Sequence, residues 1–98
     1  MAAKIVWSPA AIEDLQSIVW YVAERSRKRA RILGLALIAK VELLADHPSL
    51  GRIVPEIEDP TVREISHGTY RIVYRTDDSI LVEVVRIWHS ARGTPTLP

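Results

Sequence analysis

Hydrophobic residues recur at helical spacing in two stretches of the first half of the chain. In residues 9–25 they are Ile12, Leu15, Val19 and Val22. Steps of three and four residues predict a helix with one buried face. Ser8-Pro9 is a typical start for it, because serine caps free N–H groups and proline fits the first helical turn. A second helix is predicted from an N-cap at Ser26 to about Asp46, and the short connection makes the two an antiparallel hairpin.

Short β-branched and aromatic stretches predict strands at residues 4–7, 62–66, 70–76 and 80–88. The separators His67-Gly68-Thr69 and Asp77-Asp78-Ser79 are typical of hairpin turns, so the last three strands should be antiparallel. Residues 52–60 are rich in proline and acids and predict a loop, and residues 92–98 predict a loose tail. The expected fold is α+β, one domain over residues 1–98. In the order β-α-α-β-β-β, an N-terminal strand and an antiparallel helical hairpin pack on one face of a small antiparallel β-sheet.

Alternation along residues 70–75 indicates where this sheet could bind a partner. Tyr70, Ile72 and Tyr74 alternate with Arg71, Val73 and Arg75. One face of this strand can therefore pack on the helices while the other presents arginines on an open surface, for which Arg63 and Arg86 are further candidates. The alternative is that these arginines are simply solvated. The strand at 80–88 is apolar at both parities, so the sequence does not assign its faces.

Composition narrows the function classes. With 98 residues, 48% of them hydrophobic, the chain can bury one core. No apolar run approaches the ~18 residues of a membrane span, so we expect a soluble, cytoplasmic protein with no membrane partner. The sequence has no cysteine, which excludes a disulfide, a thiolate metal site and a thiol nucleophile. Its three histidines lack metal-ligand spacing, so we expect neither a metal nor another cofactor.

The net charge is only +1, but five of the seven residues from 25 to 31 are basic. Arg27, Lys28 and Arg29 fall at the positive end of the second predicted helix, where each cation costs about 0.3–1 kcal/mol. A docking patch for an acidic segment or a nucleic acid would explain this placement. The alternative is an exposed turn where solvent screens the penalty.

Several short motifs, spread over nearly the whole chain, resemble one family in their order and spacing. They are Trp7-Ser8-Pro9 with Asp14 and Leu15, His47-Pro48, Leu50-Gly51-Arg52, Val62-Arg63-Glu64, residues 68–75 and residues 85–92. Together they resemble the RelE/ParE toxin superfamily of type II toxin–antitoxin modules. The resemblance implies the fold derived above and a small bacterial toxin that is held inactive by an antitoxin encoded beside it.

The superfamily divides by target. RelE-like and YoeB-like members cut messenger RNA on the ribosome without a metal, whereas ParE-like members poison DNA gyrase. By resemblance to YoeB-like nucleases, Glu56 would be the general base and His89 the general acid. Arg63 and Arg71 lie on adjacent predicted strands joined by a tight turn, so they could hold a phosphate between them if they share a face. The alternatives without a catalytic role are a solvated loop carboxylate for Glu56, ion pairs with Glu64 or Glu83 for the two arginines, and a surface hydrogen-bonding role for His89.

The sequence departs from the nuclease pattern. Ser90 stands where a tyrosine would follow the histidine, and the RelE-type lysine pair is missing. The ending His89-Ser90-Ala91-Arg92 looks more like ParE-type and plasmid-stabilisation sequences. We therefore expect a ParE-like inhibitor of DNA gyrase, with a ribosome-dependent mRNA endonuclease or a degenerate member as the alternatives.

The resemblance, the strand alternation, the exposed aromatics and the basic cluster together predict two sets of binding residues. Those expected to contact the target are Arg71, Arg75, Arg86, His89 and Arg92. Those expected to contact the antitoxin are Trp20, Tyr21, Arg25 and Arg29. Large apolar groups that face water often mark contact surfaces, although core burial is the simpler account of Trp20. The sequence leaves open whether the protein also forms a homodimer.

Overall fold

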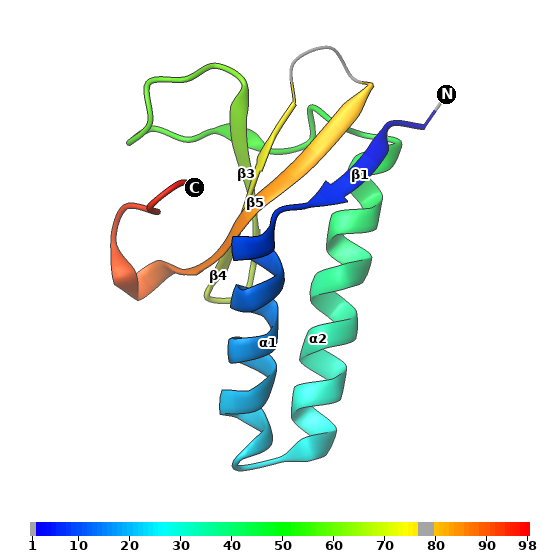
Figure 1. The fold of residues 1–98 in the computed structure, drawn as a ribbon, viewed down its shortest axis with the longest axis vertical. Helices are drawn as coiled ribbons and strands as arrows, with labels where there is room; N and C mark the ends of the chain where they lie inside the picture. The colour runs from blue at the N-terminus through cyan, green and yellow to red at the C-terminus, as the bar shows by residue number, and fades with distance from the viewer. Residues whose placement is uncertain (1, 77–79) are drawn as a thin grey trace.

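The computed structural model describes residues 2–76 and 80–98 (Figure 1). The elements are β1 (Lys4–Trp7), α1 (Pro9–Ala23), α2 (Arg27–Glu42), the 3-10 helix η1 (Leu43–Ala45), β2 (Arg52–Ile53), β3 (Val62–His67), β4 (Tyr70–Arg75), β5 (Leu81–His89) and the 3-10 helix η2 (Ser90–Arg92). The predicted α+β order is confirmed, with β2 as an added short strand in the expected loop. The separator Asp77-Asp78-Ser79 lies outside the described residues.

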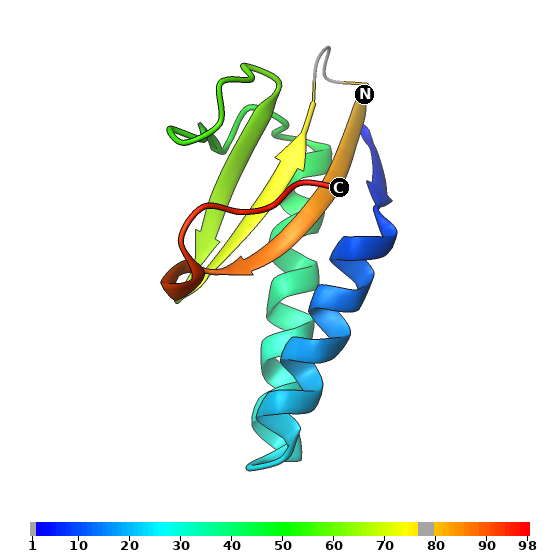
Figure 2. The same ribbon diagram turned by 60° about the vertical axis from the view of Figure 1, so that its left-hand side comes forward.

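The sheet has five strands in the order β1-β5-β4-β3-β2. Neighbours from β2 to β5 are antiparallel, but β1 runs parallel to β5, with Lys4 opposite Leu81 and Trp7 opposite Val84. The expectation of a purely antiparallel sheet is therefore wrong at β1. Figure 2 shows the arrangement: the helical hairpin covers one face of the sheet, and β1 lies beside β5 at its edge.

Serine caps start both helices, as the sequence predicts. The Ser8 hydroxyl accepts a hydrogen bond from the Ala11 N–H at 3.0 Å and donates to the Val85 carbonyl at 3.0 Å, which fixes α1 to β5. The Ser26 hydroxyl accepts from the Arg29 N–H at 3.1 Å. The two helices then run antiparallel, and only three residues, 24–26, connect them (Figure 1).

The main core lies between the hairpin and the sheet. Its buried members include Ala11, Leu37, Val41, Leu44, Ile72, Tyr74, Val82, Val84 and Ile87. Tyr74 is the largest of the fully buried side chains. Its hydroxyl donates to the Pro48 carbonyl at 2.7 Å and accepts from the Gly51 N–H at 2.9 Å, while burial raises its pKa. This buried phenol therefore fastens the chain after the helices to the centre of the sheet.

A β-bulge in β5 explains why this strand is apolar at both parities. Tyr74 pairs with Val84 and Val73 pairs with Arg86, so Val85 is an extra residue between them. Before the bulge, even-numbered residues such as Val84 face the helices; after it, odd-numbered residues such as Ile87 do. The bulge therefore places Arg86 on the face opposite the helices and His89 on the helix side.

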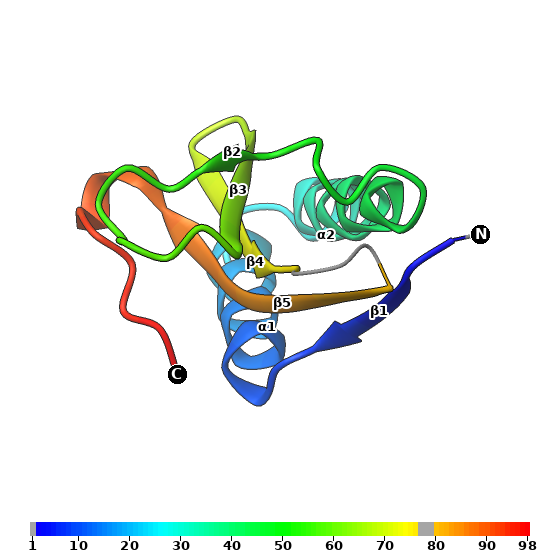
Figure 3. The same cartoon turned by 90° about the horizontal axis from the view of Figure 1, so that it is seen from above.

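The face of the sheet away from the helices, here called the outer face, is partly covered. Val54, Val62, Val73 and Val85 form a second buried cluster there, and Ile57 and Leu97 pack against it. Figure 3 shows the C-terminal segment turning back beside the sheet after η2. The centre of the expected open face is thus closed by apolar packing, and the tail expected to be loose lies against it.

Candidate functional site

Arg71 is at the centre of a chain of charges on the outer face. Its Nη1 and Nη2 donate to the two carboxylate oxygens of Glu56 at 2.9 and 3.2 Å, and its Nε donates to Glu64. Glu64 also accepts from Arg52 Nε at 2.8 Å. The side chain of Arg71 is only 12% exposed and that of Glu64 only 2%. We call these four residues the acid–arginine network.

The network favours the ionised form of Glu56. The hydrogen bond from Arg71 lowers the pKa of Glu56, and the same contact raises the pKa of Arg71. A carboxylate held ionised in this way is a weaker proton acceptor, because an efficient base has a pKa near the operating pH. The pairing of Arg71 with Glu64, one of the alternatives left open by the sequence, is what the structure contains.

Strand register separates the four residues suggested for RNA cleavage. Arg63 pairs with Tyr74, which faces the helices, whereas Arg71 pairs with Ser66 on the outer face. Because side chains alternate across a strand, the two arginines point to opposite faces and do not grip one phosphate. Arg63 instead donates to the Gly51 carbonyl at 2.8 Å. The expectation that they might share a face is therefore wrong.

His89 lies on the helix side as well. It pairs with Tyr70 across the sheet, and the two rings meet edge to face with their centroids 5.4 Å apart. Its Nδ1 accepts a hydrogen bond from the Ala91 N–H at 3.1 Å, which starts η2. Of the four residues, only Glu56 and Arg71 are in contact.

Two more arginines expected to contact a target are engaged within the chain. Arg75 forms an ion pair with Glu83 at 3.3 Å, with both side chains more than a third exposed. Arg86 donates from Nε and Nη2 to the two oxygens of Asp14, each at 2.8 Å, and this pairing raises the pKa of Arg86. Neither guanidinium is a free anion-binding group.

Asp14 belongs to a motif identified in the sequence, but its contacts with β5 were not predicted. One of its oxygens also accepts from the Ile87 N–H at 3.0 Å, so this α1 side chain covers the edge of β5 beyond the end of β1. The two contacts join residues 72 and 73 positions apart, and no local pattern could have predicted them.

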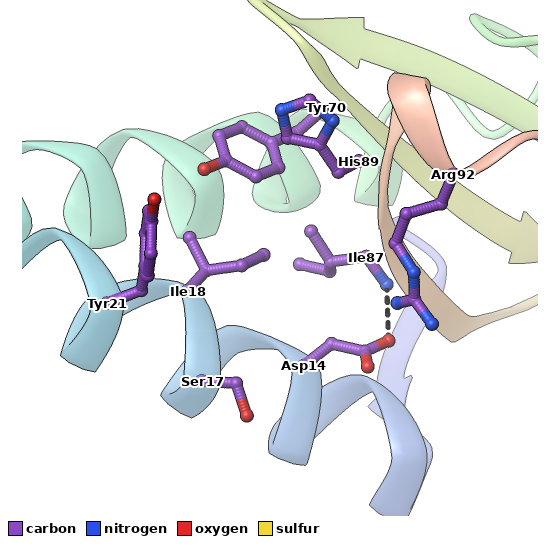
Figure 4. A pocket seen from close by; sticks show the side chains of 8 residues that line it. All are labelled: Asp14, Ser17, Ile18, Tyr21, Tyr70, Ile87, His89 and Arg92. Carbon is purple, nitrogen blue, oxygen red and sulfur yellow. Dashed lines mark hydrogen bonds between the residues drawn. The ribbon is translucent and has the colours of Figure 1, made fainter.

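A groove between α1 and the ends of β4 and β5 contains the remaining target candidates (Figure 4). Its volume is about 490 Å³, and the residues that line it are Asp14, Ser17, Ile18, Tyr21, Tyr70, Ile87, His89 and Arg92. We call it the His89–Arg92 groove. The Arg92 guanidinium carbon lies 3.9 Å from the centroid of the Trp88 ring. Within residues 2–76 and 80–98, no carboxylate pairs with Arg92, so its charge remains available in the groove.

Trp88 is a second residue that the sequence reasoning missed. Its ring is also within 4.8 Å of the Arg86 guanidinium carbon, and its indole Nε1 donates to the Gly93 carbonyl at 3.1 Å. The sequence did contain a signal for this contact: Arg86 and Trp88 are two positions apart on one strand, and such residues share a face.

A second depression of about 440 Å³ lies at the tip of the hairpin. Tyr21, Val22, Arg25, Ser26 and Arg29 line it. Tyr21 is 70% exposed and also lines the His89–Arg92 groove, so the two hollows adjoin along α1. Three of the four residues expected to contact an antitoxin thus gather at one place. Trp20, the fourth, is 73% exposed beside it in sequence but lines neither hollow.

Two negative findings apply to the described part of the chain. No three histidine, cysteine or acidic side chains gather there in a way that could hold a metal ion. None of its helices is long and apolar enough to cross a membrane.

The fold is shared with chains in solved structures of two toxin–antitoxin systems. The chain superposes on a chain of the chromosomal ParDE toxin–antitoxin system from P. aeruginosa with a TM-score of 0.73 and 21% identity, covering 90% of this chain and 96% of that one. It superposes on a chain of the toxin–antitoxin complex RelBE2 from Mycobacterium tuberculosis with a TM-score of 0.69 and 21% identity, covering 91% of this chain and 92% of that one.

Sequence similarity gives the family. Residues 5–93 match the family described as the ParE toxin of the type II toxin–antitoxin system parDE, and the chain belongs to this family. It is 35% identical over 91 residues to Toxin RelE2 of Caulobacter vibrioides, covering 92% of this chain and 98% of that protein. It is 37% identical over 93 residues to Toxin RelE1 of the same organism, covering 91% and 95%. The protein is therefore a type II toxin of the RelE/ParE superfamily.

Proposed function

We propose that this toxin is a ParE-like inhibitor of DNA gyrase that acts by binding and not by cutting RNA. The observation that carries the proposal is the division of the candidate catalytic residues between two faces of the sheet. A base, an acid and phosphate-binding cations must all reach one reacting phosphate, with proton transfers over about 2.6–3.2 Å. Arg63 and His89 are on the helix side, whereas Glu56 and Arg71 are on the outer face.

The chemistry of the remaining pair supports the same conclusion. Glu56 is held as a carboxylate by Arg71, which lowers its pKa. Each general acid or base of this kind contributes typically 10²–10⁴-fold in rate, so a set without its acid should be slow. Ser90 adds no phenol where the nuclease pattern has one.

The His89–Arg92 groove is the surface proposed for the target. Arg92 is exposed and is held over Trp88 by a cation–π contact, which orients the guanidinium without neutralising it. Beside it, Tyr21 and Tyr70 offer aromatic surface and His89 offers an imidazole. A cation among aromatic rings suits an acidic protein surface or the DNA that gyrase holds.

The cognate antitoxin is the second partner that we propose. The hairpin-tip depression combines the phenol of Tyr21 with the cations of Arg25 and Arg29, which suits an amphipathic acidic segment. Because Tyr21 lines both hollows, a segment that follows α1 from the tip would reach the His89–Arg92 groove. An antitoxin seated in this way would neutralise the toxin by covering its target surface.

The test is a supercoiling assay with purified gyrase. We expect inhibition by the wild-type toxin, retained in Glu56→Ala and strongly reduced in Arg92→Ala. Arg75→Ala is the matched control, because it also removes an exposed guanidinium but lies outside the groove. Inhibition unaffected by Arg92→Ala would contradict the groove, and no inhibition by the wild type would contradict the gyrase proposal.

A ribosome-dependent endonuclease is the second candidate function, favoured by the contact between Glu56 and Arg71. It predicts cleavage of ribosome-bound message that is lost in both Glu56→Ala and His89→Ala. A protein that only binds its antitoxin would give neither activity and no growth arrest on expression.

A further inference from the structure

The C-terminal segment, residues 93–98, is bound to the outer face through its carbonyl groups. The Gly93 carbonyl accepts from Trp88 Nε1 at 3.1 Å and from Arg71 Nη1 at 3.4 Å. The Thr96 carbonyl accepts from Arg86 Nη1 at 2.9 Å. Leu97 then packs against the buried cluster of Val54, Val62, Val73 and Val85. Figures 2 and 3 agree that the segment runs back beside the sheet.

These contacts resemble those of a bound peptide and differ from those of a sixth strand. The hydrogen bonds between the segment and the sheet are donated by side chains of β4 and β5 to carbonyl oxygens of the segment. Pro95 and Pro98 have no N–H, so the segment cannot form a complete ladder with an edge. Recognition of carbonyls and an apolar side chain suits an extended, proline-containing peptide.

The groove does not depend on the segment for its shape. Arg71 is fixed by Glu56 and Glu64, and Arg86 is fixed by Asp14. The apolar floor consists of valines from β3, β4, β5 and the loop before Ile57. A partly rigid site of this kind would remain formed if the segment left it.

The segment is joined to the domain through one turn. Gly93 has φ +77°, in the left-handed region where glycine is favoured, and there the chain leaves η2 and turns toward the outer face. The segment can therefore exchange as a unit by rotation at this position, while the strands stay in place.

We propose that the outer face is a groove for an extended peptide, and that residues 93–98 are its intramolecular occupant. The partner is an extended peptide that makes the same contacts as this segment. Trp88 and Arg71 donate to one of its backbone carbonyls, and Arg86 donates to the carbonyl three residues later. The next residue has an aliphatic side chain, which packs on the valines as Leu97 does. Such a segment binds by displacing the tail.

The valine floor of this site is on the outer face, whereas Ile87 and His89 of the His89–Arg92 groove are on the helix side, and the two sites meet where Arg92 stacks on Trp88. The occupant proposed here is an extended peptide, so the inference goes beyond the function proposed above.

The test uses a fluorescent synthetic peptide with the sequence of residues 91–98 and the full-length toxin. In Leu97→Asp the tail loses its apolar anchor, so the peptide is expected to bind in its place. The wild type should bind at least about tenfold more weakly, because a tethered segment competes at an effective concentration on the order of millimolar. A peptide carrying the same Leu97→Asp change is the matched control and should bind neither protein.

Amide NMR signals of Val73 and Val85, which belong to the cluster under Leu97, report on the site directly. We expect them to shift in Leu97→Asp and to return toward the wild-type positions when the peptide is added. If circular dichroism shows that this variant is unfolded, Leu97→Ser, which adds no charge, takes its place. Equal binding of the peptide to both proteins, absence of binding, or unchanged valine signals in the folded variant would overturn the proposal.

Discussion

The ion pair between Asp14 and Arg86 gives the sharpest test of how the helices are fastened to the sheet. Asp14 accepts three hydrogen bonds, two from the Arg86 guanidinium at 2.8 Å and one from the Ile87 N–H at 3.0 Å. The side chain of Arg86 is only 18% exposed and that of Asp14 only 12%. In Asp14→Ala, a guanidinium and a backbone N–H beside the core lose their acceptor together.

The expected loss of unfolding free energy in Asp14→Ala lies between two limits. Removing one partner of a fully buried ion pair costs about 3–5 kcal/mol, whereas exposed pairs contribute about 0–1 kcal/mol. Partial exposure of both side chains places Asp14→Ala at about 2–3 kcal/mol, because solvent can reach part of the stranded guanidinium. For a domain of this size, this loss lowers Tm by on the order of 10–20 °C.

Urea unfolding followed by circular dichroism measures this loss. Asp14→Asn keeps an oxygen for the Ile87 N–H but loses the charge, so it should fall between the wild type and Asp14→Ala. In a double-mutant cycle with Arg86→Ala, we expect a coupling energy of about 1.5 kcal/mol or more. Gln16→Ala is the matched control, since Gln16 is exposed and uncharged on the same helix and should change stability by less than about 0.5 kcal/mol. A loss in Asp14→Ala no larger than that of the control would refute the reasoning.

Three further predictions concern the acid–arginine network and the buried phenol. Because Arg71 lowers the pKa of Glu56 below its usual 4.5, the pair stabilises the fold above that pH and the contribution is lost as pH falls through the lowered pKa. The Tm advantage of the wild type over Glu56→Gln should therefore shrink on acidification, and a constant difference from pH 7 to pH 3 would contradict this. Tyr74→Phe leaves the Gly51 N–H without its acceptor and should cost about 1–3 kcal/mol in urea unfolding. Gly51→Ala should also be destabilised, by about 1–3 kcal/mol, because a Cβ there would lie 2.6 Å from a backbone carbonyl of β3; a Tm equal to that of the wild type would show that this contact can relax.

Features that depend on neighbouring residues were predictable from the sequence. Ser8 and Ser26 cap the helices that they were expected to cap, because a capping contact spans only three residues. The alternation of Tyr70, Ile72 and Tyr74 correctly indicated the face of β4 that packs on the helices, because strand periodicity is a local property.

The composition of the candidate site required knowledge of register. Whether Arg63 and Arg71 share a face depends on which residues of β3 and β4 are opposite each other, and a shift of one residue would exchange the faces. The extra residue Val85 in β5 does the same within one strand, since it moves His89 to the helix side. No pattern within a single segment contains this information.

The amino-acid sequence by itself determined the helical hairpin, the strand order along the chain and the toxin superfamily, because these rest on local periodicity, capping and short motifs. Only the tertiary structure decided that β1 is parallel to β5, that Asp14 holds Arg86 and that the C-terminal segment covers the outer face. These features join residues that are distant along the chain, and their energies exist only once the strands are in register and the helices are packed.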